Sequence, residues 1–275
     1  MKEKRSKKID IMWKYVIFAY LLFWVMVFAL GGTAAMVLEV SPLQQRMVEA
    51  FCAWAPTFAF LIMFKKLRPD STIMSFVKDQ FKHKLRLDLM LLSGMTIIAG
   101  SLLPVVILSF MNGQEVASYF SLKGYPVQVA VILSLFAGPL GEELGWRGYL
   151  RVELDKKYSF LKASVLGGVI WAFWHAVLWF IDAVIMGGST GWELIIFIVS
   201  NVVVMTSIVI VMNVILAKSN NLLNAIWIHF CFNIVYVSLI NIDMWYFVIL
   251  TVFYLIIGTV FAMYHLKWAK KRGKE

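Results

Sequence analysis

Three groups of polar side chains interrupt otherwise apolar stretches of this chain. They are Glu142, Glu143 and Arg147; His175; and His229 with Asn233. Ionisable groups are costly in hydrocarbon, so their presence in apolar stretches usually marks function. The pattern predicts a buried polar site.

The first group predicts two different roles for two adjacent carboxylates. Glu143 and Arg147 are four residues apart, which places them on one helix face as an ion pair. Glu142 is turned about 100° away from that face and is left free to act as a base. The alternative is that both are ordinary helix-end carboxylates in a loop on the cytoplasmic side.

The other two groups offer hydrogen-bonding partners. His229 and Asn233 share one helix face, so both can donate to a developing oxyanion. Alternatively they form a hydrogen-bond clip between helices, which is common in membrane bundles. His175 follows the aromatic residues Trp171, Phe173 and Trp174; it can orient a water molecule or serve as a satisfied core histidine. Because the three groups come from separate segments, a bundle core would bring them together.

The composition indicates a polytopic membrane protein. Hydrophobic residues make up 61% of the chain, charged residues only 15%, and the mean hydropathy is +0.79. Eight stretches predict transmembrane helices: residues 15–37, 47–64, 89–110, 125–140, 160–181, 194–216, 222–240 and 245–264. No repeat or linker divides the chain, so we expect one integral-membrane helical domain over residues 1–275, with the motifs within 125–240.

The net charge of +10 follows the membrane rather than a nucleic acid. Basic residues crowd the tail before Met12, the stretches 65–86 and 147–157, Lys218, and the tail 267–274, whereas the opposite loops are poor in them. This alternation predicts eight crossings with both termini in the cytoplasm. No nucleic-acid partner is expected.

Two of the connecting pieces carry structural signals. Gly138 and Pro139 stand a few residues before the glutamates, and together they predict a break in the fourth crossing. Non-helical backbone at that depth is tolerated where it lines a wet cavity, so we expect a cavity open to the cytoplasm. The stretch 65–86 predicts a short helix on the anionic membrane face.

The ordered set of motifs resembles the CPBP family (CAAX protease and bacteriocin-processing) of intramembrane endopeptidases, and within it the type II CAAX prenyl endopeptidases of the Ras-converting class. The matching positions are Glu142, Glu143 and Arg147, then His175 with Trp171 where the family usually has phenylalanine, then His229 and Asn233. The resemblance covers residues 125–240.

This resemblance implies eight helices around a conical cavity open to the cytoplasm and the inner leaflet. Glu142 would be the general base and His175 would help to hold the water, while His229 and Asn233 would form the oxyanion hole. Glu143, Arg147 and Trp171 would support them. The substrate would be a prenylated CaaX protein or peptide that loses its last three residues, delivered from membrane lipid. The membrane would be the cell membrane of a prokaryote or the endoplasmic reticulum of a eukaryote.

Two alternatives remain open at this point. Glu142, His175 and His229 would also suit a catalytic zinc site, although the chain has no His-Glu-x-x-His helix, and Asn233 suits an oxyanion donor better than a ligand. We therefore expect no metal cofactor. The second alternative is a scaffold or bacteriocin-immunity protein that keeps the fold without the chemistry.

Overall fold

The computed structural model describes residues 9–122, 125–181 and 191–272. Within these ranges the regular elements are helices, and the one strand-like pairing is an isolated bridge between Phe120 and Leu239. The longer elements are α1 (Ile11–Met26), α3 (Pro42–Cys52), α4 (Ala55–Leu67), α5 (Ile73–Phe81), α6 (Leu87–Asn112), α7 (Val127–Phe136), α10 (Phe160–Trp174), α12 (Gly191–Ser219), α13 (Leu223–Tyr236) and α14 (Met244–Lys271). The short ones are α2 (Gly32–Met36), α8 (Pro139–Glu143), α9 (Arg151–Asp155) and α11 (Ala176–Phe180). The all-α class is confirmed.

Seven helical stretches of the described chain are long and apolar enough to cross a bilayer. They are Ile11–Met36, Pro42–Leu67, Leu87–Asn112, Val127–Asp155, Phe160–Phe180, Gly191–Ser219 and Met244–Lys271. The protein is an integral, multi-pass membrane protein. The stretch expected at 222–240 forms α13, which has only 14 residues. At 1.5 Å per residue it reaches about 21 Å, short of a core of about 30 Å, so eight crossings are not confirmed.

The fourth crossing differs most from its expected bounds of 125–140. The helix breaks at Ala137 and Gly138, as the Gly-Pro pair predicted, with Gly138 at φ 139°. It then resumes through α8, a π-helical segment (Leu144–Leu150) and α9. The motif glutamates therefore lie within a continuous buried helical path instead of a loop. Single π-turns occur often at functional sites.

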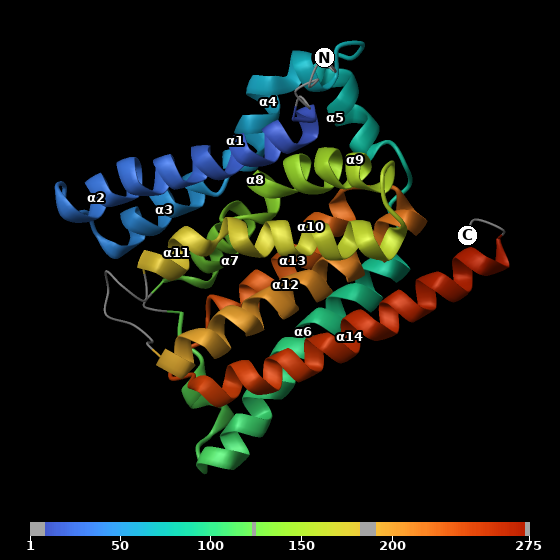
Figure 1. The fold of residues 1–275 in the computed structure, drawn as a ribbon. Coiled ribbons are helices and arrows are strands. Elements are labelled where there is room, and N and C mark those ends of the chain that lie inside the picture. The colour runs from blue at the N-terminus through green and yellow to red at the C-terminus, as the bar shows by residue number, and fades with distance from the viewer. Residues whose placement is uncertain (1–8, 123–124, 182–190, 273–275) are drawn as a thin grey trace, which may run out of the picture.

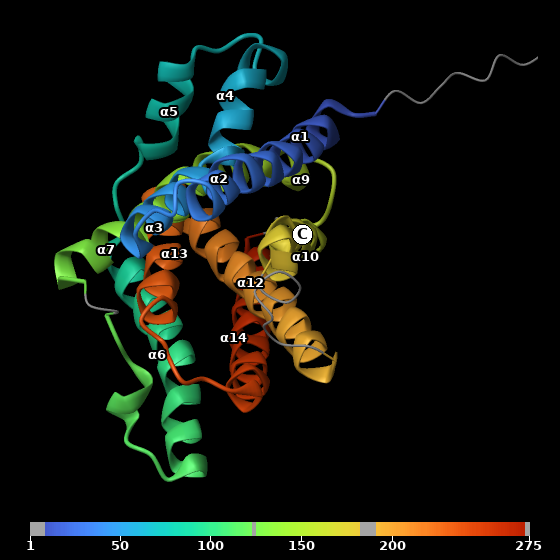
Figure 2. The ribbon, with the colours of Figure 1, turned by 90° about the vertical axis from the view of Figure 1, so that its left-hand side faces the viewer.

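The helices pack so that α8 lies between a helix from the N-terminal part of the chain and a helix from the C-terminal part. It contacts α4 on one side and α13 on the other, while α13 also packs on α6 and α12. Figures 1 and 2 show α1, α3 and α4 gathered on one side and α6, α12 and α14 on the other. The short helix expected in stretch 65–86 is present as α5.

A close approach between backbones fixes the motif helix against α4. A side chain on Gly145 would place its Cβ 2.6 Å from the carbonyl oxygen of Pro56, so only glycine fits there. The Tyr15 hydroxyl, from α1, donates to the same Pro56 oxygen at 3.1 Å. Three segments far apart in the sequence thus meet beside the glutamates.

Polar contacts also hold the end of α10 against α1. Trp24 donates its indole N–H to the Trp174 carbonyl at 3.2 Å, and Trp174 donates to Ala19 at 3.3 Å. The Tyr20 hydroxyl donates to the Ile170 carbonyl. These contacts position the last turn of α10, which carries Trp171 and leads into His175.

Candidate active site

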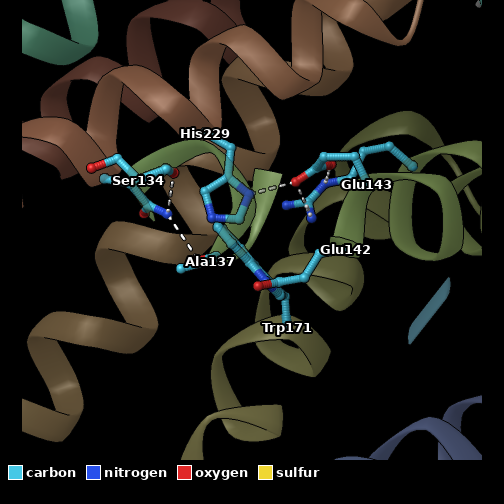
Figure 3. Close-up of polar contacts among 8 residues, drawn as sticks. Ser134, Ala137, Glu142, Glu143, Trp171 and His229 are labelled. Carbon is cyan, nitrogen blue, oxygen red and sulfur yellow. Dashed lines mark hydrogen bonds and ion pairs between the residues drawn. The ribbon is translucent and has the colours of Figure 1, made fainter. Parts of the chain in front are cut away.

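The ion pair predicted from spacing is present and fully buried. Arg147 Nε lies 3.2 Å from Glu143 Oε2, and Arg147 Nη1 donates to Glu143 Oε1 at 3.3 Å. A third group joins them, because His229 Nδ1 lies 2.8 Å from the same Oε1 atom (Figure 3). Glu143 therefore connects the motif helix to α13, a contact that spans 86 residues of sequence.

Glu142 is buried, at 2% exposure, and is held from a different helix. The indole N–H of Trp171 donates to Glu142 Oε2 at 2.5 Å. The Cζ atom of Arg147 lies 4.3 Å from the centre of the same Trp171 ring. The ring centres of Trp171 and His229 are 5.0 Å apart. Trp171 thus contacts Glu142 directly and also contacts both partners of Glu143, and its supporting role stays a prediction.

Glu142 and His229 converge on the break in the helix. A Cβ built on Gly138 would lie 2.9 Å from His229 Nε2 and 3.0 Å from Glu142 Oε1. Both atoms thus border one small space beside the Gly138 backbone, and a side chain there would fill it. The backbone angle of Gly138 also excludes most other residues. Sequence reasoning identified the break but not this convergence.

The contact with Glu143 fixes how the His229 ring is used. An ionised carboxylate only accepts hydrogen bonds, so Nδ1 carries a proton and donates it. In the neutral ring, Nε2 is then an acceptor; it becomes a donor only when both nitrogens are protonated. An oxyanion role for His229 therefore requires the doubly protonated ring.

Asn233 is used differently from the sequence expectation of a free donor. Its amide nitrogen donates to the carbonyls of Ala137 at 3.2 Å and Ser134 at 3.4 Å (Figure 3). These carbonyls end α7 at the break and lack the partners that a continuing helix would supply. The geometry is that of the clip between helices, and donation to a substrate would require Asn233 to exchange these contacts.

His175 lies at the edge of the cluster. It caps the end of α10, and its Nδ1 is 2.9 Å from the Trp171 carbonyl. Its ring packs edge-on against Trp171 and Trp174. Trp171 therefore stands between the two histidines of the site, because it contacts the rings of both His175 and His229.

The zinc alternative requires at least three ligating side chains that can reach one ion. Among the described side chains, no three His, Cys, Asp or Glu residues lie together in a way that would hold a metal ion. Glu142, His175 and His229 therefore do not form a ready ligand set in this arrangement. Both cysteines, Cys52 and Cys231, are buried and unpaired.

Two pockets flank the site. One is lined by α7 and by the segments before α7 and at the end of α13. It reaches Ser134 and Ala137 at the break, with Arg46 and Glu49 of α3 at its side. The other lies beside Arg147 and is lined by polar residues of α5, α9 and the turn between α12 and α13. A single conical cavity, as the resemblance implied, is not confirmed.

Comparison with known proteins agrees with the family resemblance predicted from the motifs. Residues 126–235 match the family model described as type II CAAX prenyl endopeptidase Rce1-like. This segment is similar to that family. It contains Glu142, Glu143, Arg147, Trp171, His175, His229 and Asn233.

A curated relative of the same kind is similar over a comparable length. CAAX prenyl protease 2 of Methanococcus maripaludis is 28% identical over 132 residues. The match covers 46% of this chain and 48% of the relative, so it spans about half the length of each. Both the family description and the relative's name are those of CAAX prenyl proteases.

Proposed function

We propose that this protein is an intramembrane endopeptidase that cleaves prenylated CaaX proteins or peptides near the C-terminus. The observation that carries the proposal is the convergence of Glu142 Oε1 and His229 Nε2 on the space beside Gly138. A base and a second polar group on one small space are what water-mediated peptide hydrolysis needs. The Rce1-like match covers the same residues.

In the proposed reaction Glu142 takes a proton from a water molecule, and the water oxygen attacks the carbonyl carbon of the scissile bond. Protonated His229 donates from Nε2 to the oxyanion, and Asn233 is the second donor once it leaves its backbone partners. His175 helps to hold the water. The proton on Glu142 then passes to the leaving amine as the C–N bond breaks, releasing a tripeptide and a new carboxylate on the prenylated cysteine.

Glu143, Arg147 and Trp171 act through the reacting groups. Glu143 holds His229 by its Nδ1 atom, and Arg147 neutralises Glu143 in a setting where an unpaired charge would be costly. Trp171 orients the second oxygen of Glu142. These three residues are positioning residues in the proposed mechanism.

The direct test is cleavage of a farnesylated CaaX peptide by purified protein in detergent, with the products identified by mass. The expected result is release of the last three residues. The same peptide without the prenyl group is the matched control, and equal cleavage of both would contradict the prenylated substrate class. No cleavage of either, by protein of normal folded content, would favour the scaffold alternative.

The metal-free mechanism has a separate test. We expect activity to survive prolonged treatment with a chelator, because the proposed steps use only side chains and water. Loss of activity on chelation followed by recovery on adding zinc would contradict this mechanism and favour the zinc alternative.

A further inference from the structure

A second polar pocket lies on the Arg147 side of the site, apart from the space at Gly138. Its volume is about 190 Å³. It is lined by Asp79, Gln80, Lys82, Arg147, Arg151, Val152, Leu216, Asn220 and Leu222. A water molecule takes on the order of 30 Å³, so a carboxylate or phosphate group would fit.

Two arginines of this pocket, the buried Arg147 and the partly buried Arg151, have unused donors. Arg147 and Arg151 are four residues apart, on one helix face. Within the described chain, Arg147 Nη2 and Arg151 Nε are buried nitrogens without a hydrogen-bond partner. A buried donor on a charged group is costly to leave unsatisfied, so this pair of atoms calls for an acceptor.

The side chains that line the pocket carry more positive than negative charge, which favours binding of an anion. Lys82, Arg147 and Arg151 line it together with a single carboxylate, Asp79, which is paired to Lys82 at 3.1 Å. Arg147 is held by Glu143 through Nε and Nη1 only, so Nη2 lies outside that pair. Arg151 Nε is 3.4 Å from Asp155 Oδ2, an ion pair without a hydrogen bond.

The pocket is coupled to the proposed catalytic groups through one carboxylate oxygen. Glu143 Oε1 lies 2.8 Å from His229 Nδ1 and 3.3 Å from Arg147 Nη1. Arg147 thus stands two contacts from His229. Three extended residues reach on the order of 10 Å, and a segment of that length would have to join the scissile bond to the pocket.

We propose that this pocket binds an oxyanion, and that its occupant is the C-terminal carboxylate of the peptide substrate. The assignment of the occupant rests on the proposed function. Guanidinium N–H groups form strong, charge-assisted hydrogen bonds to carboxylates, and here Arg147 offers Nη2 and Arg151 offers Nε. Recognition of the chain end at this distance would select a bond three residues from the C-terminus.

The first experiment measures binding and needs no cleavage. Thermal unfolding of the full chain in detergent is followed with an acetylated apolar tripeptide, either as the free acid or as the C-terminal amide. We expect the acid to raise Tm by several degrees and the amide to have little effect. The rise should be lost in Arg151→Gln and partly kept in Arg151→Lys, while Arg86→Gln, an exposed arginine outside the pocket, should behave as wild type. Equal shifts with acid and amide would overturn the carboxylate as the occupant, and an undiminished rise in Arg151→Gln would overturn the pocket as the binding site.

Inorganic phosphate separates the two parts of the proposal. A rise in Tm with phosphate that Arg151→Gln abolishes, without discrimination between acid and amide tripeptide, would keep an oxyanion site but remove the carboxylate as its occupant; a lipid phosphate would then be the source to examine. No effect of either ligand would overturn the site itself.

The second experiment compares cleavage of farnesylated CaaX peptides that end in an acid or an amide. We expect wild type to favour the acid at least tenfold in kcat/KM and Arg151→Gln to lose most of that preference. Equal cleavage of both peptides by wild type would overturn the carboxylate assignment and leave the proposed function standing. Cleavage of neither would contradict the proposed function, while the binding experiment would still decide on the pocket.

Discussion

At the scale of single residues, Trp171 contacts three of the polar side chains of the site. Its N–H holds Glu142, and its ring lies against Arg147 and His229. The resemblance placed phenylalanine at this position, and a phenyl ring could make the ring contacts but not the hydrogen bond. The two contributions of Trp171 can therefore be separated by substitution.

We predict that Trp171→Phe lowers kcat about ten- to a hundredfold, because a hydrogen bond to a charged group contributes about 1.5–3 kcal/mol. Trp171→Ala should lose more activity and also lower Tm, since the ring contacts disappear as well. The check is kcat and Tm for both variants on one farnesylated peptide. Wild-type kcat in Trp171→Phe would show that the hydrogen bond does not orient Glu142.

Sequence spacing predicted some of these residue contacts and missed others. The Glu143 and Arg147 pair follows from a separation of four on a helix. The contact of Glu143 with His229 joins residues 86 positions apart, and no local pattern reports such a distance. His229 and Asn233 were expected to act together, but in the structure they face different partners, a carboxylate and two carbonyls.

At the scale of elements, the break between α7 and α8 shapes the site. Gly138 supplies a backbone angle that other residues avoid and an empty position between Glu142 and His229. The Gly-Pro pair allowed the break to be predicted from the sequence. The π-helical segment that follows could not be, because no local residue pattern marks it; it lies where Gly145 approaches the backbone of α4.

We predict that Gly138→Ala abolishes most of the activity and lowers Tm. The Cβ would lie within 3.0 Å of both His229 Nε2 and Glu142 Oε1, and a strained backbone adds a cost of about 1–3 kcal/mol. Gly113→Ala is the matched control, since Gly113 also has positive φ but its Cβ would meet nothing within 4 Å. If both variants lose stability equally and Gly138→Ala keeps its kcat, the space at Gly138 is not part of the site.

Asn233 gives a second test at the scale of elements. Its two hydrogen bonds close the end of α7, so Asn233→Ala should destabilise the fold by about 1–3 kcal/mol through unsatisfied carbonyls. Unfolding in denaturant measures this loss. A variant with wild-type stability and strongly reduced kcat would contradict a clip and favour a dedicated oxyanion donor.

At the scale of the whole molecule, the number of crossings decides the orientation of the chain. Hydropathy and the alternation of basic loops predicted eight crossings. The structure has seven stretches of sufficient length in its described residues, and α13 is too short by length alone. The mean hydropathy of 222–240 could not show this, because the residues after Tyr236 leave the helix while staying apolar. The short α13 is largely buried by α6, α8 and α12.

We predict that both termini lie on the cytoplasmic side, as the basic tails indicate. Reporter tags at either end of the chain, probed in intact and permeabilised cells, would measure this. Tags on opposite sides would show that an odd number of segments crosses and that α13 enters and leaves on one side.

The central claim is that Glu142 is the base in a peptide hydrolysis, and one comparison tests it most directly. Purified wild type, Glu142→Gln and the exposed control Glu115→Gln are assayed on one farnesylated CaaX peptide, with Tm measured for each. General base catalysis contributes about 10²–10⁴ in rate, so kcat in Glu142→Gln should fall at least a hundredfold at unchanged Tm, while Glu115→Gln matches wild type. Wild-type kcat in a folded Glu142→Gln protein would contradict the mechanism.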